Sequence, residues 1–298
     1  MPARSFSPDQ HTAAPAERTR AELDAEYSPS RVVPDFLSIL DDYRRLSDVA
    51  KRTVACELNV RYGEAEGELL HHFPPRRAGS PLLVFVHGGH WQQLSIDDSC
   101  FAAPALVDNG AGLMVVGYRL APEGTLDAMV ASVSKALGWV AANAAALGGT
   151  PQRIHAAGSS AGAHLVAMAT ASAPATSPVR LAGVALLSGV YDLGGIRFSY
   201  VNEALRLTEE DARRNSPVHY LPIRAQEVLI ARGETETTEY GNQHDLLADA
   251  LRENEGGSSV SSLVCRGRNH FDLPLGLGDP EDELGRAVLR QMGLGERT

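Results

Sequence analysis

The stretch IHAAGSSAGAHLVAMATA, residues 154–171, contains the pattern Gly158-x-Ser160-x-Gly162. Residues 154–157 are apolar and predict a buried strand, whereas residues 161–171 predict a helix. A serine on the tight turn between a strand and a helix projects its hydroxyl out of the fold, where it can act as a nucleophile. The simpler alternative is a helix-entry loop in which the glycines only allow close packing. The strand-to-helix context favours a nucleophilic Ser160.

A second glycine-rich loop precedes this stretch by about seventy residues and reads His87-Gly88-Gly89-His90-Trp91. It directly follows the apolar run 82–86, which predicts another buried strand. Read alone, it is a glycine turn beside a core tryptophan. Beside a nucleophilic serine, however, such a loop supplies backbone amides that stabilise an oxyanion.

The remaining strands and helices alternate along the chain. Residues 125–147 carry apolar side chains every three or four positions, which predicts a helix. Strands that alternate with helices predict an α/β fold with a mostly parallel sheet covered on both faces. Residues 53–73 predict an antiparallel edge hairpin, preceded by a helix at residues 34–50. The predicted strands of the main sheet are residues 82–87, 113–118, 154–158, 181–188, 228–233 and 262–266.

We expect a single domain over residues 21–298. A mixed polar and aromatic insertion at residues 191–222 separates two strands, and we interpret it as a lid or substrate wall. Residues 1–20 carry charge and proline without an apolar core and predict a flexible lead-in rather than a signal peptide.

Composition narrows the classes of partner. The net charge is −10 without any evident lysine and arginine cluster, which argues against nucleic acid or an anionic membrane and for a small-molecule substrate. No segment approaches the roughly 18 apolar residues of a membrane helix. The three cysteines (Cys56, Cys100 and Cys265) are widely spaced, which is typical of a cytoplasmic protein without disulfides. The oligomeric state is open, with a homodimer as one option.

A serine nucleophile needs a base, and the base works best with an orienting carboxylate. In a fold of this kind the acid and then the histidine follow the serine along the chain. The loop after strand 228–233 contains Glu234, Glu236 and Glu239, and the loop after the last strand contains His270. Parallel strands would bring both loops to the sheet edge that presents Ser160. Asp272 is a further candidate for the acid.

The histidines do not predict a metal site. His87 and His90 are three residues apart, but no further ligand follows at a usable spacing, and we expect His87 to brace the glycine loop. We therefore expect neither a metal nor an organic cofactor.

Several motifs together resemble a known family, the α/β-hydrolases of the kynurenine formamidase (arylformamidase) type, relatives of the hormone-sensitive-lipase esterases. The resemblance covers about residues 22–292. The motifs shared with the wider esterase group are His87-Gly88-Gly89-His90-Trp91, Tyr118-Arg119-Leu120-Ala121-Pro122-Glu123, Gly158-Ser159-Ser160-Ala161-Gly162 and Asn269-His270-Phe271; those similar to the formamidase branch are Ser188-Gly189-Val190-Tyr191-Asp192-Leu193, Asn202-Glu203-Ala204-Leu205 and Ser216-Pro217.

The resemblance implies roles for individual residues. Ser160 would be the nucleophile, His270 the base and Glu236 the acid, at a position usually held by aspartate. The implied oxyanion donors are the backbone amides of Gly88, Gly89, His90 and Ala161. Two further departures from the family pattern are His90, where tyrosine is usual, and Ser159, where histidine is common.

The resemblance also implies the reaction, which is hydrolysis of an aryl formamide such as N-formylkynurenine to the free aniline and formate. Trp91, Ser159, Tyr191 and Asn202 would contact the substrate, with Trp91 offering an aromatic surface to the aryl ring. The alternatives are a carboxylesterase for short-chain or aryl esters and a non-catalytic binding protein of the same fold.

Overall fold

The strands of the chain form one mostly parallel sheet. The computed structural model describes residues 18–171, 180–254 and 257–295, and in these residues eight strands pair in the order β1-β2-β4-β3-β5-β6-β7-β8. Strand β2 pairs antiparallel with both β1 and β4, and all later pairs are parallel. The strands are β1 (Glu57–Arg61), β2 (Leu69–Phe73), β3 (Ser80–Val86), β4 (Gly112–Val116), β5 (Gly149–Ser159), β6 (Leu181–Leu187), β7 (Ala225–Thr235) and β8 (Ser259–Asn269).

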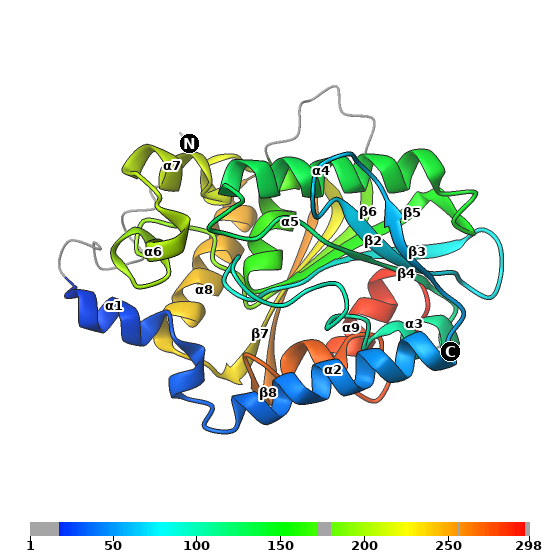
Figure 1. Cartoon of the computed structure of the whole chain (residues 1–298), viewed down its shortest axis with the longest axis horizontal. Coiled ribbons are helices and arrows are strands. Elements are labelled where there is room, and N and C mark those ends of the chain that lie inside the picture. Colours follow the sequence, from blue (N-terminus) through cyan, green and yellow to red (C-terminus); the bar gives the residue numbers. More distant parts are fainter. Residues whose placement is uncertain (1–17, 172–179, 255–256, 296–298) are drawn as a thin grey trace.

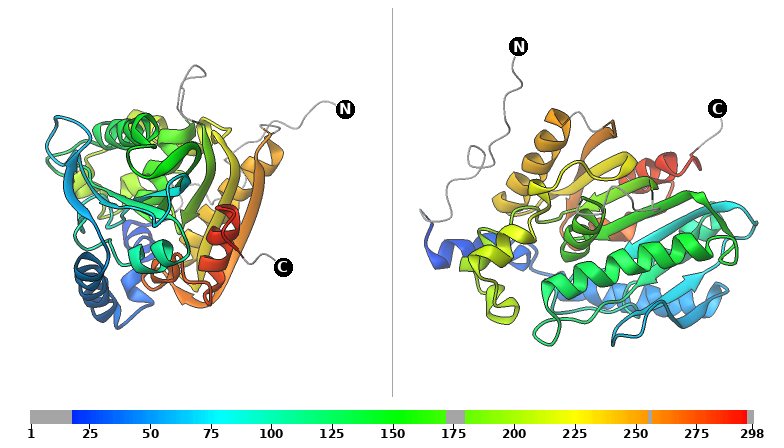
Figure 2. Two further views of the ribbon diagram at one scale, coloured as in Figure 1. Left: turned by 90° about the vertical axis from the view of Figure 1, so that its right-hand side faces the viewer. Right: turned by 90° about the horizontal axis from the view of Figure 1, so that it is seen from above.

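Helices cover both faces of this sheet (Figure 1), and the turned views show the same layers (Figure 2). Along β3, Val84 packs into one core with α4 (Leu126–Asn143), α5 (Ala161–Ala171) and α8 (Thr238–Glu253). Its neighbour Phe85 packs into a second core with α2 (Phe36–Thr53), α3 (Ala103–Asp108) and α9 (Glu283–Gln291). The alternation follows from the two-residue period of a strand, which points successive side chains to opposite faces.

The predicted fold class is confirmed, as are the predicted strands, the edge hairpin and the helices before and after it. The insertion at residues 191–222 forms only short elements. These are η4 (Ile196–Phe198), α6 (Asn202–Leu205), α7 (Glu209–Arg214) and η5 (Pro217–His219).

The N-terminal boundary needs a correction. Residues 1–17 of the predicted flexible lead-in lie outside the described residues, but its last residues belong to the folded part. Thr19 caps helix α1 (Arg20–Glu26) through a capping box with Glu22, and Arg18 forms an ion pair with Glu239 at 2.7 Å. Two further short helices are η3 (Pro29–Arg31), which follows α1, and η6 (Leu273–Gly276), which follows β8.

The topology brings separate loops to one edge of the sheet. The carboxyl ends of β3, β5, β7 and β8 lead directly into the loops that contain His87, Ser160, Glu236 and His270. In an open parallel sheet, this edge is where ligands bind.

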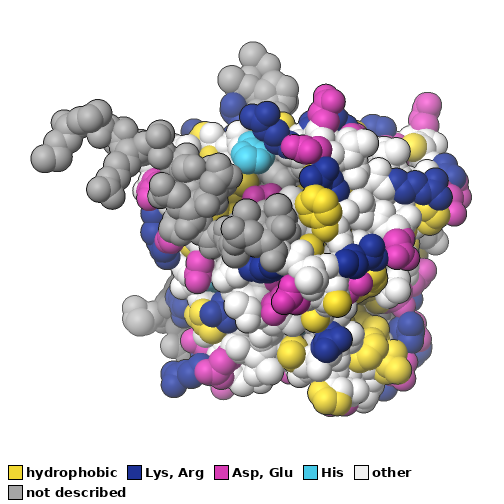
Figure 3. All heavy atoms as spheres, turned by 90° about the vertical axis from the view of Figure 1, so that its left-hand side faces the viewer, with side chains coloured by type: hydrophobic (Ala, Val, Ile, Leu, Met, Phe, Trp, Pro, Cys, Tyr) yellow, Lys and Arg dark blue, Asp and Glu magenta, His cyan; other side chains and the backbone are white. Residues whose placement is uncertain are grey.

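The described surface carries both signs of charge. On the face shown in Figure 3, Lys and Arg side chains lie next to Asp and Glu side chains without a large field of one sign. Within residues 18–171, 180–254 and 257–295, no helix is both long and apolar enough to cross a membrane.

His155, a buried histidine away from this edge, is expected to make the stability of the folded protein sensitive to acid. His155 on β5 is 2% exposed, and burial lowers the pKa of His155 to about 4. Because an unfolded histidine takes up a proton near pH ~6.5, the unfolded state gains stability as the pH falls from there towards 4. Above that range the neutral form is favoured in both states and the effect is constant.

We expect His155→Leu to abolish the proton uptake that accompanies unfolding at this position. As the pH falls from ~6.5 to 4, the free energy of unfolding of the variant should rise relative to wild type by about 1.4 kcal/mol per pH unit. Above pH ~7 the difference between the two proteins should be constant. Urea unfolding at pH 5 and pH 8 measures it. Parallel stability curves for the two proteins would contradict the prediction.

Candidate active site

Ser160 occupies the strained turn that the sequence predicts. Its φ is 54°, in the left-handed region that non-glycine residues rarely adopt, and its amide donates to the Leu187 carbonyl at 2.7 Å. A Cβ on Gly158 would overlap the Gly162 carbonyl, and a Cβ on Gly162 would overlap the Val86 carbonyl at the end of β3. Both glycines are therefore required for α5 to begin close against the sheet.

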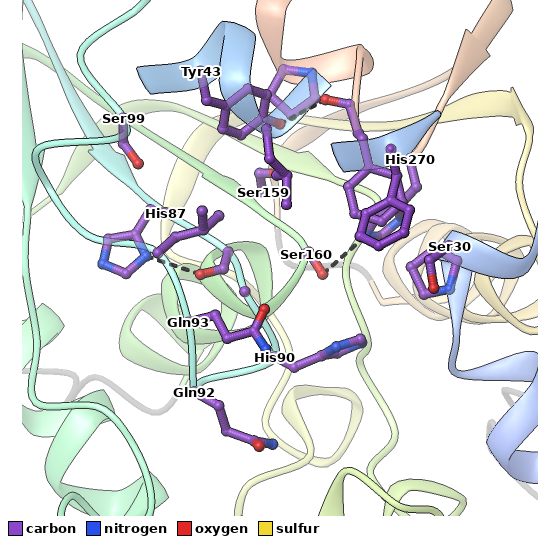
Figure 4. Close-up of a pocket in the computed structure, with 18 of the residues that line it drawn as sticks. Ser30, Tyr43, His87, His90, Gln92, Gln93, Ser99, Ser159, Ser160 and His270 are labelled. Carbon is purple, nitrogen blue, oxygen red and sulfur yellow. Dashed lines mark hydrogen bonds between the residues drawn. The ribbon is translucent and has the colours of Figure 1, made fainter. Parts of the chain in front are cut away.

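Three side chains from different loops form a hydrogen-bonded chain. His270 Nε2 lies 3.1 Å from Ser160 Oγ, and His270 Nδ1 lies 3.0 Å from Glu236 Oε2. The bond between Ser160 and His270 is drawn in Figure 4. The side chains of His270 and Glu236 are 6% and 1% exposed. The chain can thus pass a proton from the serine hydroxyl to an imidazole that a buried carboxylate orients.

Glu236 is held by more than the histidine. Its Oε1 accepts hydrogen bonds from the Ser188 hydroxyl and the Gly233 amide, each at 2.6 Å. Ser188 lies directly after β6 with φ of 49°, and its contact with Glu236 was not predicted from the sequence. In the sequence, Ser188 is the first residue of the motif 188–193 that is similar to the formamidase branch.

The other candidate acids serve elsewhere. Glu234 is exposed and accepts from the Gly267 amide, whereas Glu239 is buried and accepts from Tyr27 and Arg18. Glu239 is therefore a buried structural carboxylate, and only Glu234 is open to solvent. Asp272 accepts from the amide and side chain of Asn269 and so shapes the loop around His270.

The glycine-rich loop lies beside the serine. A Cβ on Gly88 would come within 2.7 Å of the Ser159 carbonyl, so only glycine allows this approach. Gly89, His90 and Trp91 have φ of 100°, 51° and 61°, and the turn is closed by the amides of Gln92 and Gln93 on the Gly89 carbonyl at 2.9 Å. Within the described residues, the amides of Gly89 and His90 do not donate to any backbone carbonyl.

His87 supports this loop, as expected. Its ring stacks on that of Tyr118 with centroids 4.6 Å apart, and its Nδ1 lies 2.9 Å from the Gly88 carbonyl oxygen. Burial lowers the pKa of His87 to about 4, so the imidazole is neutral at ordinary pH.

A cavity of about 250 Å³ opens over Ser160. Figure 4 shows Ser160, His270 and His90 around it, with Ser159 and His87 nearby. Aromatic side chains from widely separated segments form much of its wall: Phe36, Tyr43, Phe85, Phe101, Tyr200 and Phe271.

The N-terminal segment supplies part of this wall, which the sequence pattern does not predict. The Tyr43 hydroxyl donates to the Phe271 carbonyl at 2.7 Å, and the Phe36 and Phe271 rings lie 5.3 Å apart. Helix α2 is thereby fixed against the loop that carries His270. Nothing in the sequence pattern of α2 distinguishes these residues from ordinary core aromatics.

The structure places three of the predicted substrate contacts away from this cavity. Trp91 is fully buried and donates through Nε1 to His164 Nδ1 at 3.2 Å, because it faces inward from the loop. Tyr191 is also fully buried, and its amide donates to Gln243 Oε1 at 2.7 Å. Among the described residues that line the cavity, neither is present, whereas Ser159 is.

Asn202 is the third. Its side-chain oxygen accepts from the Leu207 amide at 2.7 Å, and its nitrogen donates to the Arg197 carbonyl at 2.9 Å. Asn202 therefore organises the insertion instead of lining the cavity, and Tyr200 is the residue by which the insertion reaches it.

The part of the chain that the structure describes gathers no group of three or more His, Cys, Asp or Glu side chains suited to a metal ion.

The sheet, the serine turn and the hydrogen-bonded histidine together define an α/β-hydrolase fold. A protein provisionally assigned as a thioesterase from Silicibacter sp. tm1040 superposes with a TM-score of 0.80 over 90% of this chain and 99% of that chain, at 24% identity. The BD-FAE family model matches residues 71–181.

Sequence relatives give the family. The chain is 34% identical to kynurenine formamidase of Danio rerio, over 92% of this chain and 97% of the relative. It is 32% identical to kynurenine formamidase of Salmo salar, over 93% and 98%. The chain belongs to the kynurenine formamidase family.

Proposed function

We propose that this protein is a serine hydrolase that cleaves aryl formamides, N-formylkynurenine among them, to the free aniline and formate. The observation that carries the proposal is the hydrogen-bonded chain of Ser160, His270 and Glu236 at an aromatic-lined cavity, in a chain of the kynurenine formamidase family.

The first half of the reaction forms a formyl-enzyme. Ser160 Oγ attacks the formyl carbon while its proton passes to His270 Nε2, and Glu236 stabilises the imidazolium that results. Backbone amides of the 88–90 loop, together with that of Ala161, hold the oxyanion. Ala161 is the first residue of α5, so its amide has no partner within the helix. When the C–N bond breaks, His270 returns the proton to the aniline nitrogen.

The second half releases formate. His270 takes a proton from water, the hydroxide attacks the formyl ester, and the proton then returns to Ser160 Oγ. An aniline leaves more readily than an alkylamine, so an esterase-like site can expel it. The aromatic wall, with Phe271 directly beside His270 at 5.4 Å between ring centroids, offers apolar surface to an aryl ring.

The cysteines support a reducing compartment such as the cytoplasm. All three are free, and burial raises the pKa of both Cys100 and Cys265 to about 12, which makes them poor nucleophiles.

We expect purified enzyme to hydrolyse N-formylkynurenine with a kcat/KM above that for p-nitrophenyl acetate, because the cavity is built for an aryl group beside the reacting bond. Measuring both substrates side by side, with kynurenine and nitrophenol as the products followed, tests this. Brisk cleavage of the ester without formation of kynurenine would leave a hydrolase but overturn the formamidase assignment.

A further inference from the structure

One side chain contacts both the proposed base and the proposed oxyanion loop. Tyr240 lies in the first turn of α8 and is 1% exposed. Its ring packs against the His270 ring with centroids 4.4 Å apart, and its hydroxyl lies 3.2 Å from His90 Nε2. Nothing in the sequence singles out Tyr240, because a tyrosine in a helix predicts only core packing.

The direction of the bond between Tyr240 and His90 follows from their protonation states. Burial raises the pKa of Tyr240, so the phenol keeps its proton. Burial, together with the neighbouring His270, lowers the pKa of His90 to about 4, so this imidazole is neutral at ordinary pH. Since His90 is neutral, its Nε2 can accept a hydrogen bond from the phenol. We therefore assign Tyr240 Oη–H as the donor and His90 Nε2 as the acceptor.

The loop has reason to need this bond. His90 and Trp91 are consecutive non-glycine residues with φ of 51° and 61°, a conformation that persists only where surrounding contacts enforce it. Trp91 is fixed by its indole bond to His164 and by the Ala121 amide on its carbonyl at 2.9 Å. His90 carries one of the proposed oxyanion amides, and its side chain is held by the Tyr240 hydroxyl together with the Tyr27 backbone.

Tyr240 is itself on a well-fixed turn. Its neighbour Glu239 accepts from the Tyr27 hydroxyl at 3.0 Å and from Arg18 at 2.7 Å, and the Glu239 amide donates to Glu26 at 2.8 Å. These bonds tie the start of α8 to the N-terminal segment. The Tyr240 hydroxyl is therefore presented from a rigid support.

We propose that Tyr240 is a positioning residue for the reaction, whose hydroxyl holds His90 and the oxyanion amides in place while its ring supports the His270 imidazole. The proposal rests on the proposed serine mechanism. It explains how one helix, α8, which follows directly after Glu236, aligns groups on two sides of Ser160.

The test begins with Tyr240→Phe, which keeps the ring against His270 and removes only the hydroxyl. Because an oxyanion exists only in the transition state, we expect kcat to fall roughly 10- to 100-fold while KM changes by less than about threefold. His90→Phe should have a similar effect, and the double variant should be no worse than the more affected single variant. His90→Gln, which keeps an acceptor near the position of Nε2, should retain most of kcat.

Tyr62→Phe is the matched control. Tyr62 is also a buried tyrosine, and its hydroxyl donates to the Gly117 carbonyl at 2.6 Å. It follows β1 directly, at the edge of the sheet opposite β8. Its loss should lower Tm and leave kcat intact, which separates a general stability effect from a positioning effect.

Wild-type kcat in Tyr240→Phe, or effects of Tyr240→Phe and His90→Phe that multiply in the double variant, would overturn the proposal. Ser160→Ala, assayed in the same series, separates this failure from that of the mechanism. An inactive Ser160→Ala beside a fully active Tyr240→Phe refutes only the positioning role, whereas an active Ser160→Ala refutes the serine mechanism.

Discussion

Replacement of Ser160 by alanine should reduce kcat for aryl formamide hydrolysis by a factor on the order of 10⁴ to 10⁶. The hydroxyl at the strained turn is the group 3.1 Å from the His270 imidazole, and without it the base has no nucleophile to activate. The alanine fills the same space, so Tm should change little. Steady-state kinetics together with a thermal melt of both proteins measure the two effects.

The adjacent Ser159 provides the comparison for Ser160. It lines the cavity, but His270 is bonded to Ser160 instead. Ser159→Ala should therefore lose far less activity than Ser160→Ala. A Ser160→Ala variant that keeps most of the wild-type rate would show that the nucleophile lies elsewhere.

Replacement of Glu236 by glutamine should reduce kcat by a factor on the order of 10³ to 10⁴. Glu236 accepts three hydrogen bonds, from His270, Ser188 and the Gly233 amide. A glutamine of the same shape has only one acceptor oxygen, so its amide nitrogen would face a donor, and it cannot stabilise the imidazolium by charge. Kinetic measurement on freshly purified variant, with circular dichroism to verify the fold, tests this expectation.

The neighbouring carboxylates are controls for Glu236. Glu234→Gln changes an exposed residue and should have little effect on kcat. Glu239→Gln weakens the buried contacts with Arg18 and Tyr27, so its main effect should be a lower Tm, with a smaller loss of kcat. Equal and small losses from Glu236→Gln and Glu234→Gln would assign the acid elsewhere. A larger loss from Asp272→Asn would point to Asp272.

The elements of the fold could be predicted because their signals are local. The apolar runs before Ser160 and His87 mark strands, and Gly158 is required by a contact within the serine turn itself, with the Gly162 carbonyl. The Gly-x-Ser-x-Gly pattern also contains Gly162, although the contact that requires this glycine is with Val86 at the end of β3. The order of the polar loops after successive parallel strands then brings Ser160, Glu236 and His270 to one edge, because that edge is common to all parallel strands.

The pocket wall could not be predicted in the same way. Trp91 follows the glycine loop directly, yet the left-handed backbone at His90 and Trp91 turns the indole into the core. The surface expected of Trp91 is provided instead by rings such as Phe36 and Phe271, which are more than two hundred residues apart in the chain. Contacts of this kind depend on how α2 packs against a distant loop, and a single sequence carries no local pattern for them.

The choice among Glu234, Glu236 and Glu239 shows the same limit. All three are carboxylates in one short loop, and the sequence places each of them near a strand end. The carboxylate that faces His270 is Glu236, and it is held there by a hydrogen bond from the Ser188 hydroxyl. Ser188 lies at the end of a different strand, so the loop sequence alone does not reveal this contact. The resemblance to the family, and not the residue pattern, singled out Glu236.

We propose Ser160 as the nucleophile in aryl formamide hydrolysis. The most direct test is a titration of the enzyme with a fluorophosphonate while N-formylkynurenine hydrolysis is followed, with peptide mapping of the product. We predict that one equivalent abolishes kynurenine formation and that the adduct maps to Ser160. An adduct on another residue, or full turnover of N-formylkynurenine by enzyme labelled at Ser160, would contradict the assignment of Ser160 as the nucleophile.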